Sequence, residues 1–256
     1  MATLLLKKSY RHKDLKEILF KDLWSSYGIF TTMRVVGKPL KIILFKSHIN
    51  NLIKSLKIYK IYKKDLRKKI LHIIKLNLNK NKKYDHLLRI ASNKRIISIS
   101  LRKRLKPKRN FKLHLINYKR VKPEYKNLMY KKILGILKKM DTTRNDVALY
   151  KDKKLLESGT SNLLFATKNK IFTPINGFYK GNTFKHMQKK IKIYKRNIYL
   201  DSLDQYDEII LIGSGKGVSS VSSIKNNKWR RKSHKSFKIL NNFYQKTVTK
   251  CPRYYS

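Results

Sequence analysis

The chain has 256 residues, of which 64 are Lys or Arg and only 14 are Asp or Glu, so its formal net charge is +50. Hydrophobic residues make up 41% of the chain and Gly and Pro are few, which excludes collagen-like and disordered classes and predicts a packed core. The single cysteine, Cys251, cannot form an internal disulfide, so we expect a cytoplasmic protein. No apolar run approaches the roughly 18 residues of a membrane span, so we expect no membrane association.

The positive charge is spread along the whole chain and forms no single patch or tail. Such a charge attracts polyanions, which makes nucleic acid a partner to consider. Lysine outnumbers arginine by more than three to one, although arginine is the better reader of bases and phosphates. Lys, Ile, Asn, Tyr and Phe are abundant together, which is typical of an AT-rich genome. We therefore expect only non-specific nucleic-acid binding, through charge.

The first half of the chain alternates β-rich and helical segments. Residues 28–46 predict a β-hairpin with Gly37 and Pro39 in its turn. Ser47 is a candidate cap for a helix, because apolar residues follow it at helical spacing. The remaining expected elements are a helix over 64–78 and strands over 86–91, 95–101 and 111–117.

The pattern changes after Pro123, where the second half begins. A helix is expected over 128–140, because Ile133, Leu134 and Leu137 form an apolar stripe. The elements then expected are strands over 146–150, 163–167 and 170–173, a helix over 182–193, a strand over 207–212 that runs into the Gly-rich 213–217, and a C-terminal helix from near Ser236. Together they predict an α+β fold with a small domain over 1–115, a linker over 116–123 and a larger domain over 124–256.

Four sequence blocks carry a family resemblance. They are GIFTTMRVVGK at 28–38 with HINNL at 48–52; KNLMY at 126–130; LESGTSNLLF at 156–165 with IFTP at 171–174 and GNT at 181–183; and DEIILIGSG at 207–215 with Val218 and Val221. In this order the blocks resemble the class IV, or fold-type IV, pyridoxal-phosphate enzymes, which include 4-amino-4-deoxychorismate lyase, branched-chain aminotransferase and D-amino-acid aminotransferase. The resemblance implies the two-domain D-amino-acid aminotransferase-like architecture and a homodimer.

The cofactor implied by the resemblance is pyridoxal 5'-phosphate, which needs an amine that binds it and a carboxylate beside its ring nitrogen. The resemblance places the amine on Lys126, with Lys122 and Lys131 as near neighbours, and the carboxylate on Glu157. Tyr130 is expected either to bond the ring hydroxyl or to face the substrate, and ordinary helix packing is the alternative. These three residues are the candidate catalytic residues.

Phosphate needs several hydrogen-bond donors, which backbone N–H groups at a helix start or a Gly turn supply. Two stretches fit, Gly181-Asn182-Thr183 and Ser214-Gly215, and the family uses both places. A nucleotide P-loop is excluded, because its glycine and lysine spacing is absent. Thr31 and Arg34 are candidates to reach substrate carboxylates, with plain strand positions as the alternative. No metal site is expected.

The chain departs from the family pattern at a few positions. Asn51 stands where the family has an arginine that contacts the phosphate, so Asn51 is expected to bind it more weakly unless Lys54 or Arg89 substitutes. Met129 and Phe184 also replace residues that are frequent in the family. An inactive relative is therefore an alternative to an enzyme.

Three functions follow from these patterns. The short chain and the 28–38 and 126–130 blocks look most like aminodeoxychorismate lyase, which would release pyruvate and 4-aminobenzoate for folate synthesis. The competitor is a branched-chain or D-amino-acid aminotransferase, since the same scaffold runs both reactions. Either would act on a small amino or dicarboxylate substrate. The third function is a polyanion binder that kept the fold and lost the cofactor.

Overall fold

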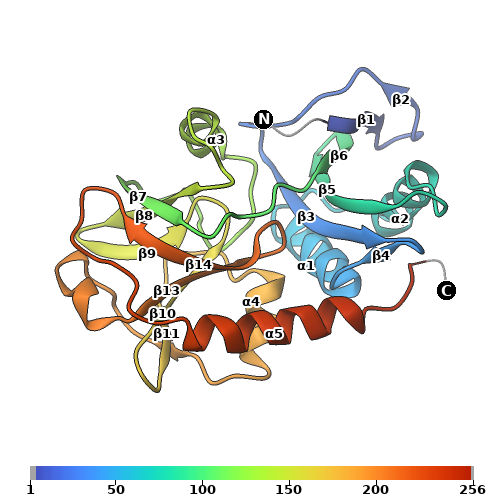
Figure 1. The fold of residues 1–256 in the computed structure, drawn as a ribbon. Coiled ribbons are helices and arrows are strands. Elements are labelled where there is room, and N and C mark those ends of the chain that lie inside the picture. Colours follow the sequence, from blue (N-terminus) through green and yellow to red (C-terminus); the bar gives the residue numbers. More distant parts are fainter. Residues whose placement is uncertain (1–3, 255–256) are drawn as a thin grey trace. The chain divides into compact units, whose positions relative to one another are not determined.

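The structure is a computed structural model that describes residues 4–254, and its contacts divide the chain into two compact units (Figure 1). Unit 1 comprises the chain up to Arg104, Tyr125–Lys131 and the residues from Lys250. Unit 2 comprises Leu105–Glu124 and Lys132–Thr249. Each unit combines one sheet with helices, which confirms the predicted α+β class.

Unit 1 contains a six-stranded antiparallel sheet in the order β2-β1-β6-β5-β3-β4. Helix α1 packs on β3, because its apolar residues Ile49, Leu52, Ile53 and Leu56 recur on one face and are all buried. The elements of this unit are β1 (Leu4–Arg11), β2 (Glu17–Ile18), β3 (Gly28–Gly37), β4 (Lys41–Ile42), α1 (Phe45–Ile58), α2 (Leu66–Asn77), β5 (Tyr84–Asn93) and β6 (Ile96–Lys103).

Unit 2 contains an eight-stranded mixed sheet in the order β12-β11-β10-β13-β14-β7-β8-β9. Separate apolar clusters are buried in this unit, and one of them includes residues of α4 and α5. The elements are β7 (Phe111–Asn117), α3 (Lys131–Lys138), β8 (Asn145–Lys151), β9 (Lys154–Ser158), β10 (Asn162–Ala166), β11 (Ile171–Thr173), α4 (Asn182–Gln188), β12 (Tyr194–Lys195), the 3-10 helix η1 (Leu200–Gln205), β13 (Glu208–Gly213), β14 (Gly217–Ile224) and α5 (Lys235–Thr249).

The two units do not follow the predicted domains, 1–115 and 124–256 with a linker over 116–123. Strand β7 belongs to unit 2, because it pairs in parallel with both β8 and β14, so the first boundary lies near Arg104. The segment Tyr125–Lys131 belongs to unit 1, because Asn127 forms an antiparallel bridge with Ile29 on β3. Lys126 therefore lies in the first unit, whereas the sequence placed it in the second domain.

Several helices are shorter than predicted. The helix expected over 128–140 spans only Lys131–Lys138, because the chain just before it is extended and pairs with β3 through Lys126 and Leu128. The helix expected over 182–193 ends at Gln188. No helix within residues 4–254 is both long and apolar enough to cross a bilayer.

Candidate active site

The peptide around Lys126 is held in an extended form along strand β3. The N–H of Phe30 donates to the carbonyl of Lys126 at 2.9 Å, and the N–H of Leu128 donates to the carbonyl of Gly28 at 3.0 Å. The Lys126 side chain is half-buried, and its Nζ lies 4.8 Å from the centroid of the Phe30 ring. Backbone pairing with β3 thus fixes the position from which the Lys126 side chain extends.

Aromatic rings and a second cation surround the same phenylalanine. Tyr130 is 8% exposed, and its ring centroid lies 5.8 Å from that of Phe30 and 6.1 Å from that of Trp24. The guanidinium of Arg89 lies 3.7 Å from the Trp24 centroid and 5.5 Å from that of Phe30. Burial lowers the pKa of Arg89 to about 10, which leaves it charged at neutral pH. The amine of Lys126 and the ring of Tyr130 therefore share one aromatic cluster.

Thr31 and Arg34 point to opposite faces of β3, because side chains alternate along a strand. Thr31 is buried, and its Oγ1 lies 2.7 Å from Nδ1 of His48. Arg34 is 9% exposed, and its Nη2 lies 3.5 Å from a carboxylate oxygen of Asp85. The expectation that both reach one substrate therefore meets a geometric obstacle. Asn51 is half-buried on α1, about one turn after His48.

Glu157 is one of the buried acids of unit 2. It lies on β9 opposite Leu149, and it is 4% exposed. Its Oε1 accepts a hydrogen bond from Nε of Arg120 at 2.5 Å, and its Oε2 accepts from Nη2 of Arg120 at 3.1 Å. The N–H of Tyr179 also donates to Oε2 at 3.3 Å. A guanidinium that binds both oxygens keeps a buried carboxylate ionised.

Asn162 connects this acid to the Gly181 turn. Its Nδ2 donates to the carbonyl of Tyr179 at 2.6 Å, and its Oδ1 accepts from the N–H of Gly181 at 3.1 Å. A Cβ on Gly181 would lie 2.9 Å from that Oδ1, so no larger residue fits without displacing the amide. Asn182 and Thr183 follow in the first turn of α4 and are buried.

The second phosphate candidate, Ser214-Gly215, lies in the turn between β13 and β14. Gly213 at its start is close to Ser161, since a Cβ there would lie 3.1 Å from the serine Oγ. Asn162 pairs with Ile212 in the adjacent ladder. Unit 2 thus brings Glu157 and both phosphate candidates together, through the short segment 158–162.

The predicted site residues divide between the units. Arg120 and Asp146 were not predicted, although both contact the predicted segments directly. The only sequence signal for Arg120 is its place six residues before Lys126. Unit 1 holds Thr31, Arg34, Asn51, Lys126 and Tyr130, and unit 2 holds Glu157, Gly181, Asn182, Thr183, Ser214 and Gly215.

Comparisons with known proteins give one consistent family and fold. The family model described as amino-transferase class IV matches residues 28–224. No sequence among the curated proteins matches. The chain is similar to a branched-chain aminotransferase of Thermoproteus uzoniensis, with 16% identity, a TM-score of 0.75 and 95% of each chain covered.

Two further solved structures share the fold. The first is a candidate 4-amino-4-deoxychorismate lyase of Legionella pneumophila, with 18% identity, a TM-score of 0.69, and coverage of 86% of this chain and 91% of that chain. The second is an aminotransferase of Brucella abortus bound to pyridoxal phosphate, with 13% identity, a TM-score of 0.73, and coverage of 94% and 98%. The predicted fold-type IV architecture is therefore confirmed.

Proposed function

The chain belongs to the class IV aminotransferase family, and from this premise we propose that it is a pyridoxal-phosphate-dependent 4-amino-4-deoxychorismate lyase. The cofactor supplies an aldehyde that binds amines and a ring that accepts electrons from the substrate carbon. The observation that carries the proposal is the buried Glu157 carboxylate with its bidentate arginine. A carboxylate held ionised in this way fits the protonated ring nitrogen of that cofactor.

Lys126 is the proposed amine for the cofactor aldehyde. Once freed from the cofactor, the Lys126 amine would take the proton from the substrate carbon that bears the amino group. The ether C–O bond would then break, and the proton would pass to the departing enolpyruvate, which becomes pyruvate and leaves 4-aminobenzoate. Tyr130, in the same aromatic cluster, is proposed to bond the ring hydroxyl or to contact the substrate. The backbone of Lys126 is held by pairing with β3, so the lysine has a fixed Cα from which its amine can reach the substrate.

Phosphate binding is proposed for Gly181, Asn182, Thr183, Ser214 and Gly215, with Asn51 as an uncharged donor. The support is the connection of these turns to Glu157 through segment 158–162.

The substrate is proposed to be a small amino acid with more than one carboxylate, bound by a homodimer in the cytoplasm. Arg34 lies on the same face of β3 as Phe30, and the Phe30 ring contacts the Lys126 amine. This placement favours Arg34 over Thr31 as the substrate contact. The runner-up is a branched-chain or D-amino-acid aminotransferase. The branched-chain enzyme above has the higher TM-score, 0.75 against 0.69, and it is the observation that favours this alternative.

The test of function uses the purified protein loaded with pyridoxal phosphate. We expect a visible absorption band, and borohydride reduction should fix the cofactor on the peptide that contains Lys126. Lys126→Ala should abolish turnover, while Lys122→Ala and Lys131→Ala, its sequence neighbours, should retain it. Attachment to another lysine would refute the assignment.

The need for a keto-acid acceptor distinguishes the lyase reaction from the aminotransferase reaction. A lyase releases pyruvate from aminodeoxychorismate without any added keto acid, whereas an aminotransferase turns over only with one. Absence of the visible band together with DNA binding that persists at physiological salt would instead support the polyanion binder.

A further inference from the structure

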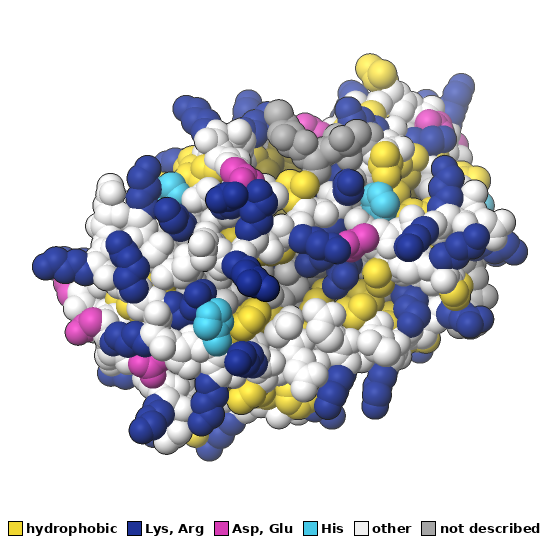
Figure 2. Space-filling view, in the orientation of Figure 1, with side chains coloured by type: hydrophobic (Ala, Val, Ile, Leu, Met, Phe, Trp, Pro, Cys, Tyr) yellow, Lys and Arg dark blue, Asp and Glu magenta, His cyan; other side chains and the backbone are white. Residues whose placement is uncertain are grey.

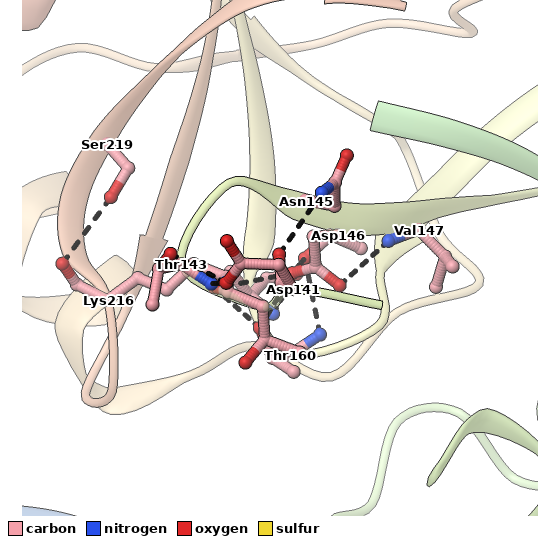
Figure 3. Close-up of polar contacts among 11 residues, drawn as sticks. Asp141, Thr143, Asn145, Asp146, Val147, Thr160, Lys216 and Ser219 are labelled. Carbon is pink, nitrogen blue, oxygen red and sulfur yellow. Dashed lines mark hydrogen bonds and ion pairs between the residues drawn. The ribbon is translucent and has the colours of Figure 1, made fainter. Parts of the chain in front are cut away.

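A buried ion pair in unit 2 contacts two of the segments assigned above to the cofactor. Nζ of Lys216 lies 3.7 Å from Oδ2 of Asp146, and the side chains are 9% and 0% exposed. Lys216 directly follows Gly215 in the β13–β14 turn, and Asp146 lies on β8. Figure 3 shows the lysine side chain extending from its hairpin toward the aspartate.

The same carboxylate holds the turn that follows Glu157. Oδ2 of Asp146 accepts a hydrogen bond from Oγ1 of Thr160 at 2.7 Å (Figure 3). The same oxygen accepts a hydrogen bond from Oγ of Ser158 at 3.2 Å. Its Oδ1 accepts the N–H of Val147 at 2.8 Å. A Cβ on Gly159 would lie 2.9 Å from Oδ1, so the turn packs directly against the carboxylate.

The lysine makes its other contacts inside unit 2. Its Nζ lies 4.7 Å from the centroid of the Phe111 ring and 3.5 Å from the carbonyl oxygen of Thr142. Burying a charged side chain is costly unless an opposite charge and hydrogen-bond acceptors offset the loss of water. Asp146 thus offsets the charge of Lys216, and this ion pair anchors the β13–β14 hairpin.

We propose that Asp146 is a positioning residue for the phosphate of the cofactor. Through Lys216 it fixes the turn Ser214-Gly215, and through Thr160 it fixes the turn after Glu157, against which Gly213 packs. Donors held in place before binding lose little conformational freedom when the anion arrives, so affinity depends on the anchor. The inference rests on the proposed function, because it takes these turns to serve one cofactor.

The experiment compares cofactor affinity in Asp146→Asn, Lys216→Met and the double variant, with pyridoxal 5'-phosphate and pyridoxal as probes. Each single variant should raise the Kd for pyridoxal phosphate about tenfold, the scale on which supporting residues affect a bound group. The Kd for pyridoxal, which has no phosphate, should stay within about twofold. The double variant should bind no more weakly than Asp146→Asn, since Lys216 acts only through its contact with Asp146.

The matched control is Asp201→Asn, which removes an exposed ion pair with Lys153 in the same unit. It should leave both affinities unchanged. Equal weakening of both probes would reveal a general loss of structure and overturn the proposal. Weakening in Lys216→Met alone would mean that the lysine itself binds phosphate, which also overturns it.

Hydrogen exchange tests the anchor without any cofactor. In Asp146→Asn the amides of residues 213–217 should exchange about tenfold faster than in Asp201→Asn, because the hairpin opens more easily. Unchanged exchange would overturn the inference. A wild-type protein that binds no cofactor would overturn the proposed function, and the exchange result would still decide whether Asp146 anchors the turn.

Discussion

At position 48 the surroundings keep a histidine neutral. Burial, and to a smaller extent the positive charge of Lys126, lower the pKa of His48 to about 3. In the unfolded chain a histidine titrates near 6.5, so between these values the unfolded state binds a proton that the folded state rejects. Stability is therefore fully present above about pH 6.5 and is lost as the pH falls toward 3.

This single residue should contribute a slope of about 1.4 kcal/mol per pH unit to the free energy of unfolding below pH 6. We expect the free energy of unfolding, measured by urea denaturation between pH 7.5 and pH 5, to depend less steeply on pH in His48→Gln than in the wild type, by this amount. The exposed His72 provides the control, since His72→Gln should keep the wild-type slope. Equal slopes in the wild type and His48→Gln would contradict the assignment.

Single residues were predictable from sequence only where a motif marked them. Glu157 stands out because acids are rare in this chain and its block is specific. Arg120 and Asp146 gave no such signal, because one arginine among 64 basic residues looks like a surface charge, and the aspartate is separated from Lys216 by seventy residues of sequence. Only the folded sheet brings these partners together.

Among the elements, the β13–β14 hairpin depends on a glycine. Gly217 has φ +72°, and a Cβ there would lie 2.8 Å from Cε1 of Tyr244 on α5. Gly217→Ala should therefore destabilise the protein by roughly 1–3 kcal/mol, measured by denaturant unfolding.

The matched control for this substitution is Gly135→Ala on α3, where a Cβ meets nothing within 4 Å. In a helix interior alanine is favoured over glycine, so this variant should be about 0.5–1 kcal/mol more stable. Destabilisation of equal size in both variants would contradict the steric account at Gly217.

Elements with a regular apolar period were predicted well, and strands with few or interrupted apolar residues were missed. Helices α1 and α2 lie within a few residues of their predicted ranges, because their buried residues recur at helical spacing. Strand β14 was not predicted, since its serines hide the alternation. Strand β9 was not predicted, since it has only two apolar residues, Leu155 and Leu156. Strand β1 was missed because lysines interrupt its short leucine run.

For the whole molecule, the charge of +50 is a stability factor in its own right. Figure 2 shows Lys and Arg side chains scattered over the face in view, with few acids among them. Mutual repulsion at low ionic strength disfavours the compact state, and salt screens it. Raising the ionic strength from about 0.01 M to 0.15 M should therefore raise the Tm by about 2–4 °C.

Sodium chloride and sodium sulfate at equal ionic strength separate screening from anion binding. Screening gives the same Tm rise in both salts, whereas a bound anion would give a larger rise in sulfate. A Tm that falls with added chloride would contradict the repulsion account.

The repeated passage of the chain from one unit to the other could not be predicted from the sequence. Pro123 marks a real change of pattern, and the family match over 28–224 covers both units. The return of Tyr125–Lys131 to β3 is set by pairing with residues nearly a hundred positions earlier. Local patterns carry no information on such long-range pairing, which is why the predicted boundaries were wrong.

Unit 1 is assembled from three separate stretches of chain. Its last stretch places the N–H of Tyr254 on the carbonyl of Leu40 at 2.8 Å and the Tyr254 ring 4.9 Å from that of Phe45. A ribosome makes these residues after all of unit 2. The unit whose first residues leave the ribosome earliest is therefore the one that is completed last.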